Sequence, residues 1–254
     1  MILTALSGPQ GCGKTTLLEG IKRAMGRQLE STNDKALLAI DDFKVARTVL
    51  AQNYPGMSLD EVVSNPKRAA EFQTEILFCK SQRDMHLKNS HLYARRRVHL
   101  TERSLADVRV YAEEWFAANP FEHSNKSVYY RACDALQQQV YDFVIFVPYG
   151  THEFVEEHNR ASKEAVFRVE SRLVEVLEQV GTPTFVVEPF DVEGRVEAVI
   201  GFIAKLATLA SARGPEAFVR ARDALTRLHT SDLRGRFESV VSRREEIQKC
   251  QKSQ

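Results

Sequence analysis

Residues 2–16 read Ile-Leu-Thr-Ala-Leu-Ser-Gly-Pro-Gln-Gly-Cys-Gly-Lys-Thr-Thr, and this stretch decides the fold. The apolar run at its start predicts a buried strand, and the sequence from Lys14 predicts a helix over 14–27. Between the two, the residues from Gly8 to Thr15 fit the pattern G-x-x-x-x-G-K-[ST] without a mismatch. A glycine-rich turn that joins a strand to a helix indicates an α/β protein.

The glycines of this turn allow a backbone that can surround an anion, because Gly8, Gly11 and Gly13 can adopt angles closed to other residues. The positive end of the helix dipole lies beneath the same anion. Under this hypothesis Lys14 reaches the β- and γ-phosphates of a nucleotide, and Thr15 offers its hydroxyl to Mg²⁺. The alternative is a glycine turn that binds nothing. Cys12 is interpreted as a small filler in the loop, with a redox switch as the alternative. The residues predicted to bind the nucleotide are Gly8, Gln10, Gly11, Cys12, Gly13, Lys14, Thr15 and Thr16.

The composition describes a globular protein with a sizeable core. The chain has 254 residues, of which 43% are hydrophobic and 27% are charged, and its formal net charge is +1. The four cysteines are scattered, which favours reduced thiols in the cytoplasm. We expect no contact with a membrane, because no apolar run approaches the roughly 20 residues that a spanning helix needs.

Strands and helices alternate along the first 210 residues. The patterns predict further strands over 35–41, 98–104, 141–148 and 184–189, and helices over 43–52, 66–89, 105–117, 127–140 and 192–209. A helix that contains Arg168 and Arg172 is expected to end near Val180. Gly214-Pro215 breaks the chain, and helices over 215–229 and 231–250 follow. The sequence therefore predicts a three-layer α/β/α domain over 1–210 with a five-stranded parallel sheet, and a helical C-terminal extension over 211–254.

Charged residues follow two of the predicted strands. Asp41 and Asp42 end the second strand, at the edge where parallel sheets bind ligands, and either could act on an acceptor hydroxyl. Asp42 could instead cap the next helix. Glu102 and Arg103 end the third strand, where the carboxylate could hold Mg²⁺ and the guanidinium could bind phosphate. An internal Glu–Arg salt bridge is the structural alternative.

The remaining candidate residues lie on helices and in one polar loop. Phe72 is a core residue by default, and the neighbouring Gln73 could turn toward a pocket. The loop over 149–160 has the composition of a lid that closes over phosphate. Arg160 is the first candidate for a lid arginine and Arg168 the second, and either could be a surface cation. His152 and His158 match no closed zinc pattern.

Basic residues gather in two regions. Lys80, Arg83, Lys88 and the arginines at 95–97 form the densest basic stretch, read as a solvated face or a phosphate-facing edge. From Lys205 onward there are eleven basic and six acidic residues, a net charge of +5, which leaves −4 for the body. A basic tail on an acidic body is compatible with an anionic partner such as DNA, and equally with a solvated helix face.

Residues 1–205 resemble the nucleoside and nucleotide kinases among the P-loop proteins. Gly8–Thr15, Asp41-Asp42, Phe72-Gln73 and Glu102-Arg103-Ser104 stand in the order of the corresponding motifs of deoxynucleoside kinases. The ATPase/kinase family that includes the ribosylnicotinamide kinase domain is similar in Phe72-Gln73 and in Glu102 to Tyr111. The similarity also covers the stretch from Arg160 through Arg172 to the closing Glu193-Gly-Arg-Val. The Asp-Asp pair, Lys44 and the absence of an Arg-x-Arg-x-x-Glu lid depart from deoxynucleoside kinases.

The resemblance implies a role for each matched residue. Glu102 would help to hold Mg²⁺, Arg103 would bind the acceptor end or a phosphate, and Arg160 would close over the transferred group. Gln73 would bind a base edge, while Phe72 stacks or packs. The expected activity is transfer of the γ-phosphate of ATP, with Mg²⁺, to a hydroxyl of a free nucleoside or nucleotide. The alternatives are a kinase for a hydroxymethylated pyrimidine within DNA, as in bacteriophage 5-hydroxymethyluracil kinases, and a nucleotide-binding switch. The oligomeric state is left open.

Overall fold

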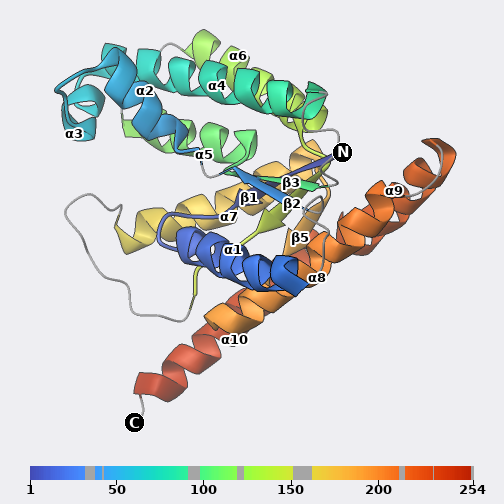
Figure 1. Ribbon diagram of the computed structural model, residues 1–254. Helices are drawn as coiled ribbons and strands as arrows, with labels where there is room; N and C mark the ends of the chain where they lie inside the picture. The colour runs from blue at the N-terminus through green and yellow to red at the C-terminus, as the bar shows by residue number, and fades with distance from the viewer. Residues whose placement is uncertain are drawn as a thin grey trace.

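The fold is built on a sheet of five parallel strands (Figure 1). The computed structural model describes residues 1–31, 38–41, 43–90, 98–118, 123–150, 162–211, 215–230 and 232–252. The strands are β1 (Ile2–Ser7), β2 (Leu38–Asp41), β3 (Val98–Glu102), β4 (Phe143–Phe146) and β5 (Thr184–Val186), in the order β2-β3-β1-β4-β5. The predicted five-stranded parallel sheet is confirmed.

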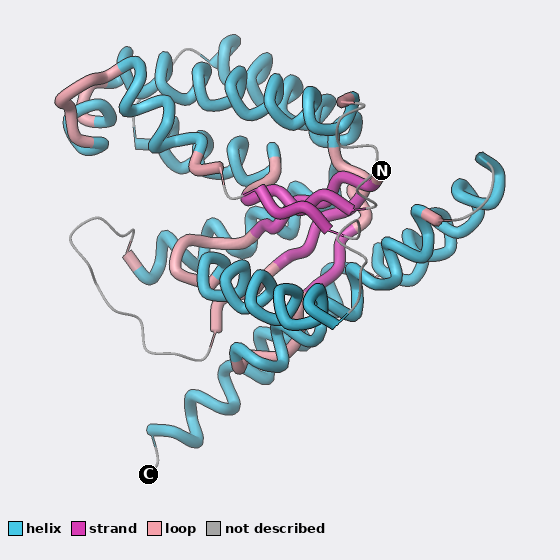
Figure 2. Tube along the Cα trace, viewed as in Figure 1, coloured by secondary structure: helices cyan, strands magenta, loops and turns pink. Residues whose placement is uncertain are grey.

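Helices cover both faces of the sheet, as the two layers of helix around the strands in Figure 2 show. Side chains alternate along β1, so that Ile2 and Leu6 face one core and Leu3 and Ala5 face the other. The first core is closed by α1 (Lys14–Ser31) and α8 (Val192–Ala210). The second is closed mainly by α4 (Pro66–Asn89), α5 (Leu105–Ala118), α6 (His123–Val140) and α7 (Lys163–Val180). The remaining described helices are α2 (Val45–Asn53), α3 (Leu59–Val63), α9 (Pro215–Thr230) and α10 (Leu233–Lys252).

Most expected elements are present, and the differences have local causes. The third strand ends at Glu102 instead of 104, because Arg103 takes a left-handed backbone with φ of 62°. The helix expected from Phe43 begins at Val45, and Lys44 is its N-cap, so the expectation that Asp42 caps it is wrong. Helix α3 was not predicted, although Ser58 and Glu61 form a capping box at its start.

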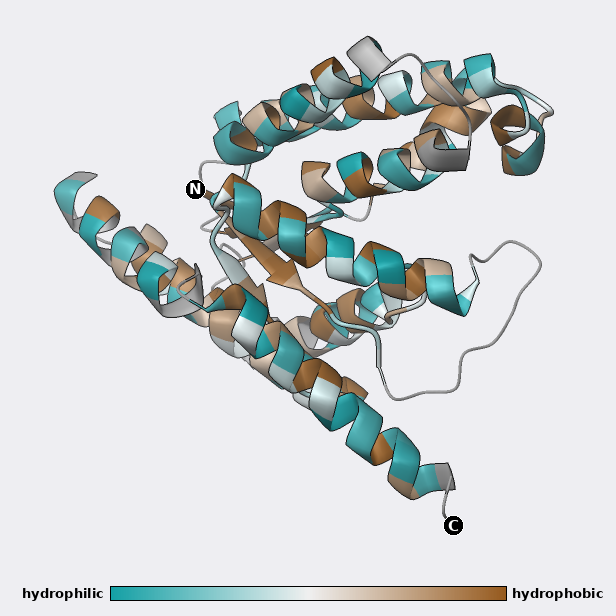
Figure 3. Cartoon of the chain, turned by 180° about the vertical axis from the view of Figure 1, so that it is seen from behind, coloured by the Kyte–Doolittle hydropathy of each residue, from teal (hydrophilic) through white to brown (hydrophobic). Residues whose placement is uncertain are grey.

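The C-terminal helices belong to the same packed structure. Helix α10 contacts α7 and β5, and its Leu233, Phe237 and Val240 are buried in the second core. The ring of Phe237 meets the ring of Phe146 edge-on, with centroids 6.0 Å apart. Figure 3 shows that the end of α10 projects from the body and is mainly hydrophilic. One half of the helix is therefore a core element and the other half is exposed.

Candidate active site

The loop after β1 has the conformation that its glycines predict. Gly8, Gly11 and Gly13 have φ angles of 146°, 77° and 90°, which other residues adopt only with strain. A Cβ atom on Gly8 would lie 2.3 Å from the carbonyl oxygen of Val147, so this glycine also allows the loop to approach β4 closely. Cys12 is fully buried in the core beneath the loop, in agreement with its interpretation as a filler.

Lys14 is the first residue of α1, and its ammonium lies within the loop. Its Nζ donates to the carbonyl oxygens of Gly8 at 2.7 Å and Pro9 at 2.6 Å, and contacts the Sγ of Cys12 at 3.3 Å. The residue is only 6% exposed. Thr15 and Thr16 are exposed in the first turn of the helix. The loop therefore combines a helix N-terminus with a buried cation, as a phosphate site requires.

The end of β3 is joined to this loop through Asp107, which the sequence analysis missed. Asp107 is fully buried and accepts hydrogen bonds from the N–H of Gly8 at 3.4 Å and the N–H of Ser104 at 2.8 Å. It also pairs with Arg103, whose Nη1 lies 3.3 Å from Oδ1. The spacing Ser104-x-x-Asp107 at the start of a helix was a signal that could have found it.

Arg103 is held between Asp107 and an aromatic ring. Its N–H donates to the carbonyl of Leu6 at 2.9 Å, and its guanidinium lies 4.5 Å from the centroid of Tyr111. Desolvation opposes its charge, but Tyr111, Asp107 and Glu102 together outweigh it and raise the pKa of Arg103. The guanidinium is thus a fixed cation beside the loop.

The carboxylates at the strand ends have partners other than those expected. Glu102 pairs with Lys44 from the segment before α2, and no Glu102–Arg103 salt bridge is found among the described residues. Asp41 binds Arg83 of α4 through both oxygens, at 2.8 Å from Nε and 2.5 Å from Nη2. Asp41 also accepts the N–H of Phe43 at 3.2 Å. Asp42 lies outside the described residues.

Phe72 and Gln73 lie on the inner side of α4. Phe72 is 1% exposed and packs edge-on against Tyr54 and face-on against Trp115, which confirms it as a core residue. Gln73 is also buried, and its backbone carbonyl accepts the hydroxyl of Tyr129 at 3.1 Å.

Arg195 also supports the loop after β1. This residue of α8 donates to the carbonyl oxygens of Cys12 at 2.7 Å, Pro148 at 3.0 Å and Pro189 at 2.9 Å. Burial lowers the pKa of Arg195, yet a guanidinium stays charged in proteins. Arg195 belongs to the motif Glu193-Gly-Arg-Val, from which no role was predicted for it. Arg195 therefore connects the loop with the ends of β4 and β5.

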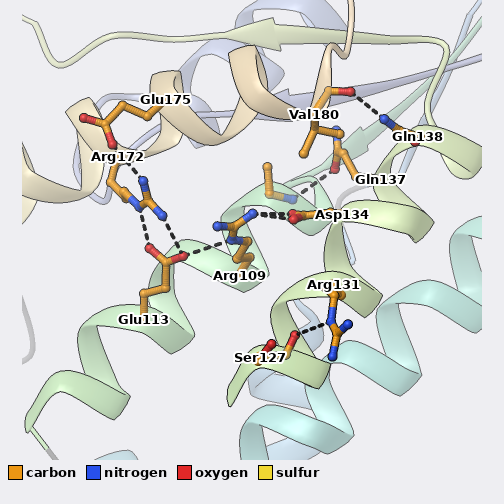
Figure 4. Close-up of polar contacts among 11 residues, drawn as sticks. Arg109, Glu113, Ser127, Arg131, Asp134, Gln137, Gln138, Arg172, Glu175 and Val180 are labelled. Atoms are coloured by element: carbon orange, nitrogen blue, oxygen red, sulfur yellow. Dashed lines mark hydrogen bonds and ion pairs between the residues drawn. The ribbon is translucent and has the colours of Figure 1, made fainter. Parts of the chain in front are cut away.

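A network of ion pairs joins the middle of α7 to α5 and α6. Figure 4 shows Arg109 between Glu113 and Asp134, and Arg172 between Glu113 and Glu175. Arg168 lies near the start of α7, is mostly exposed and pairs with Glu114 at 3.0 Å. Arg160, the first candidate for the lid, lies outside the described residues.

The comparisons with known proteins agree with this geometry. The model of the family "Deoxynucleoside kinase" matches residues 5–180. The chain belongs to the deoxynucleoside kinase family. It is therefore an ATP-dependent nucleoside kinase, a phosphotransferase that acts on a hydroxyl group. Helices α8, α9 and α10 lie beyond the matched residues.

A solved structure shows the same fold. The deoxyadenosine kinase from M. mycoides with bound dCTP is similar to this kinase with a TM-score of 0.53 and 18% sequence identity. The match covers 80% of this chain and 99% of that chain. Among curated proteins no significant match was found.

The three basic residues of the stretch that lie on α4 are each paired with a carboxylate, and one of them is buried. Lys80 is fully buried, pairs with Asp84 at 2.7 Å and donates to the hydroxyl of Thr101 at 2.9 Å. Arg83 and Lys88 are each bound to a carboxylate as well. The reading of Lys80 as part of a solvated or phosphate-facing edge is wrong. Residues 95–97 lie outside the described part of the kinase.

The described residues contain no cluster of three or more His, Cys, Asp or Glu side chains placed to hold a metal ion. No helix among them combines the length and the apolar character that crossing a membrane requires.

We predict that Gly8→Ala destabilises the kinase, because the new methyl group meets the carbonyl of Val147 at a strained backbone position. The expected loss in the free energy of unfolding is about 1–3 kcal/mol, measured by urea denaturation. Gly201→Ala is the control, since this helical glycine has open space around it. This change should raise the free energy of unfolding by about 0.5–1 kcal/mol. Equal effects of the two changes would contradict the close approach.

We also predict that Asp107→Ala weakens both the fold and the binding of ATP. The N–H groups of Gly8 and Ser104 would lose their acceptor, which costs about 1–3 kcal/mol for each buried group. Thermal unfolding and the KM for ATP measure the two effects. Asp60→Ala, at the exposed start of α3, should change the unfolding free energy by less than about 1 kcal/mol and leave the KM unchanged.

Proposed function

We propose that this kinase transfers the γ-phosphoryl group of Mg·ATP to a hydroxyl of a free nucleoside or nucleotide. The observation that carries the proposal is the buried carboxylate of Asp107, which binds both Gly8 of the loop and Arg103 at the end of β3. This contact supports a single site in which Lys14 and the loop hold the donor phosphates and Arg103 aligns the acceptor. Catalysis then consists mainly of positioning and charge neutralisation.

Residues near the loop carry the kinds of oxygen atom that bind a magnesium ion. Thr15 offers an exposed hydroxyl, Glu102 offers a carboxylate, and both are the oxygen ligands that Mg²⁺ prefers. Ser7, at the end of β1, has a buried hydroxyl without a hydrogen-bond partner among the described residues. We propose that Thr15 and Glu102 hold the ion, which neutralises charge on the phosphates when it is bound.

The acceptor is proposed to bind toward α4. Gln73 is the candidate for contact with a base edge, and Phe72 shapes the wall by packing between Tyr54 and Trp115. Asp41 or Asp42 would act on the acceptor hydroxyl. Arg83 binds both oxygens of Asp41, so this carboxylate has a fixed orientation from which it could orient the acceptor hydroxyl. The arginines of the proposed lid are Arg160 and, as second candidate, Arg168.

The two alternative functions have less support. A DNA acceptor drew on the basic stretch and the basic tail, but Lys80 is buried and Arg244 in the tail is only 6% exposed. A small-molecule acceptor agrees with the family. A switch that only hydrolyses ATP would need no group that aligns an acceptor, which is the role proposed here for Arg103.

Transfer of ³²P from labelled ATP tests the proposal. The acceptors are a panel of nucleosides and monophosphates, together with duplex DNA with and without hydroxymethylated pyrimidines. We expect label in a nucleoside, and no measurable transfer by Lys14→Met, because its ammonium is the cation within the loop. Lys67→Met, at an exposed position of α4, should be fully active. Label in DNA alone, or in inorganic phosphate alone, would refute the proposed acceptor.

A second experiment separates Asp41 from Asp42. Changing the residue that acts as general base to Asn should lower the kcat of the kinase about 100-fold or more. The other variant should change the KM for the nucleoside more than kcat. Rapid-quench measurement of the first turnover reports the chemical step directly. Full activity in both variants would exclude a general base at this strand end.

A further inference from the structure

The C-terminal helix reaches the nucleotide side of the sheet through Arg244. This residue of α10 is 6% exposed, and its Nη1 donates to the Oε2 of Glu170 at 2.9 Å and to the carbonyl of Tyr149 at 3.3 Å. Its guanidinium also lies 4.7 Å from the ring centroid of Phe167. An arginine in a tail that the sequence presents as basic and exposed is thus bound inside the protein.

Glu170 completes a clamp on the backbone of Tyr149. It is 1% exposed, and its Oε1 accepts the N–H of Tyr149 at 2.5 Å. Burial raises the pKa of Glu170, and the charge of Arg244 and the amide of Tyr149 oppose that rise. The N–H and the C=O of Tyr149 are therefore held by the two partners of one buried ion pair.

Tyr149 in turn packs against the phosphate-binding loop. A Cβ atom on Gly11 would lie 3.5 Å from Cε2 of Tyr149, so the ring is next to the loop at this glycine. The ring also meets Phe167 edge-on at 5.6 Å. The preceding Pro148 accepts a hydrogen bond from Arg195, which binds the loop at Cys12. The segment that follows β4 therefore packs along one side of the phosphate-binding loop.

Arg243, next to Arg244, contacts the loop that follows β5. It donates to the carbonyl of Glu188, and its guanidinium lies 5.1 Å from the ring centroid of Phe190. Two consecutive arginines of α10 thus hold the segments after β4 and after β5. These segments flank the donor side of the proposed site.

We propose that Arg244 is a positioning residue for the binding of the donor nucleotide. It acts through Glu170 and Tyr149 on the phosphate-binding loop, so that α10 is part of the donor site instead of a surface for a polyanionic partner. This inference rests on the proposed binding of Mg·ATP at the loop. It concerns a helix beyond residues 5–180, which the family model matches.

Steady-state kinetics of Arg244→Met test the inference. We expect the KM for ATP to rise about tenfold, the effect of losing one hydrogen bond from a charged group. The KM for the nucleoside and kcat should change less than about twofold, because the end of β3 does not depend on this contact. A merely structural role would lower the active fraction, and so kcat, with both KM values unchanged; that result would overturn the inference. Arg234→Met, on the same helix with an exposed pair to Glu178, should match the unchanged kinase.

Two further variants keep the test valid if the single change prevents folding. Glu170→Gln combined with Arg244→Met removes both buried charges, and an amide oxygen can still accept the N–H of Tyr149. This double variant should fold and keep a raised KM for ATP, since the carbonyl of Tyr149 lacks its donor. Arg244→Lys should recover part of the affinity, because an ammonium can still pair with Glu170. A normal KM for ATP in the folded double variant would overturn the inference.

Calorimetric titration with Mg·ATP separates this inference from the proposed function. If the unchanged kinase binds ATP and Lys14→Met does not, the donor site is at the loop. In that case, an affinity of Arg244→Met for Mg·ATP equal to that of the unchanged kinase would refute the positioning role alone. If Lys14→Met binds as well as the unchanged kinase, the proposed donor site fails, and the positioning role fails with it.

Discussion

The buried carbonyl oxygens of the phosphate-binding loop must find donors within the protein, and Gly8, Pro9 and Cys12 of this loop are buried. Lys14 binds those of Gly8 and Pro9, and Arg195 binds that of Cys12. The carbonyl of Gly13 accepts the N–H of Leu17 in α1. Two cations that satisfy the loop carbonyls also add positive charge where an anion is expected. Under the proposed function, the stability of the loop and its affinity for phosphate depend on the same side chains.

The order of the strands explains where these supports originate. In the order β2-β3-β1-β4-β5, strand β1 lies between β3 and β4. The segments that follow these two strands must then flank the loop that follows β1. Asp107 follows β3 and binds the N–H of Gly8, and Tyr149 follows β4 and lies next to Gly11. Residues about 100 and 140 positions away in sequence are neighbours of the loop because parallel strands place their ends together.

The sequence predicted the parts of the site that are local. The pattern from Gly8 to Thr15 fixed the turn and the positive φ angles of its glycines, since both depend on adjacent residues. The partners of the strand-end carboxylates could not be predicted in this way. Lys44 binds Glu102, and Arg83 binds Asp41, across separations that no local pattern encodes. Charge alone did not distinguish a buried lysine such as Lys80 from an exposed one.

The spacing of residues along α10 distinguishes a buried arginine from an exposed one, which the net charge of the helix does not. Leu233, Phe237, Val240 and Arg244 are spaced by four, three and four residues, which places them on one stripe of a helix. All four are buried, whereas Arg234 lies off this stripe and is exposed. An arginine that continues an apolar stripe is thus expected to lie under the protein surface, where it needs a partner of opposite charge. A count of basic residues misses this, because it treats both arginines alike.

Two buried ion pairs lie behind the proposed site, and each holds a polar group in place. A buried pair seldom stabilises a fold more than apolar side chains of the same volume would. What apolar residues cannot do is hold a polar group in a fixed direction. Lys80, paired with Asp84, fixes the hydroxyl of Thr101, the residue before Glu102. Arg244, paired with Glu170, fixes the backbone of Tyr149 beside the loop. Each pair lies behind one proposed half of the reaction, the metal-binding strand end in one case and the donor phosphates in the other.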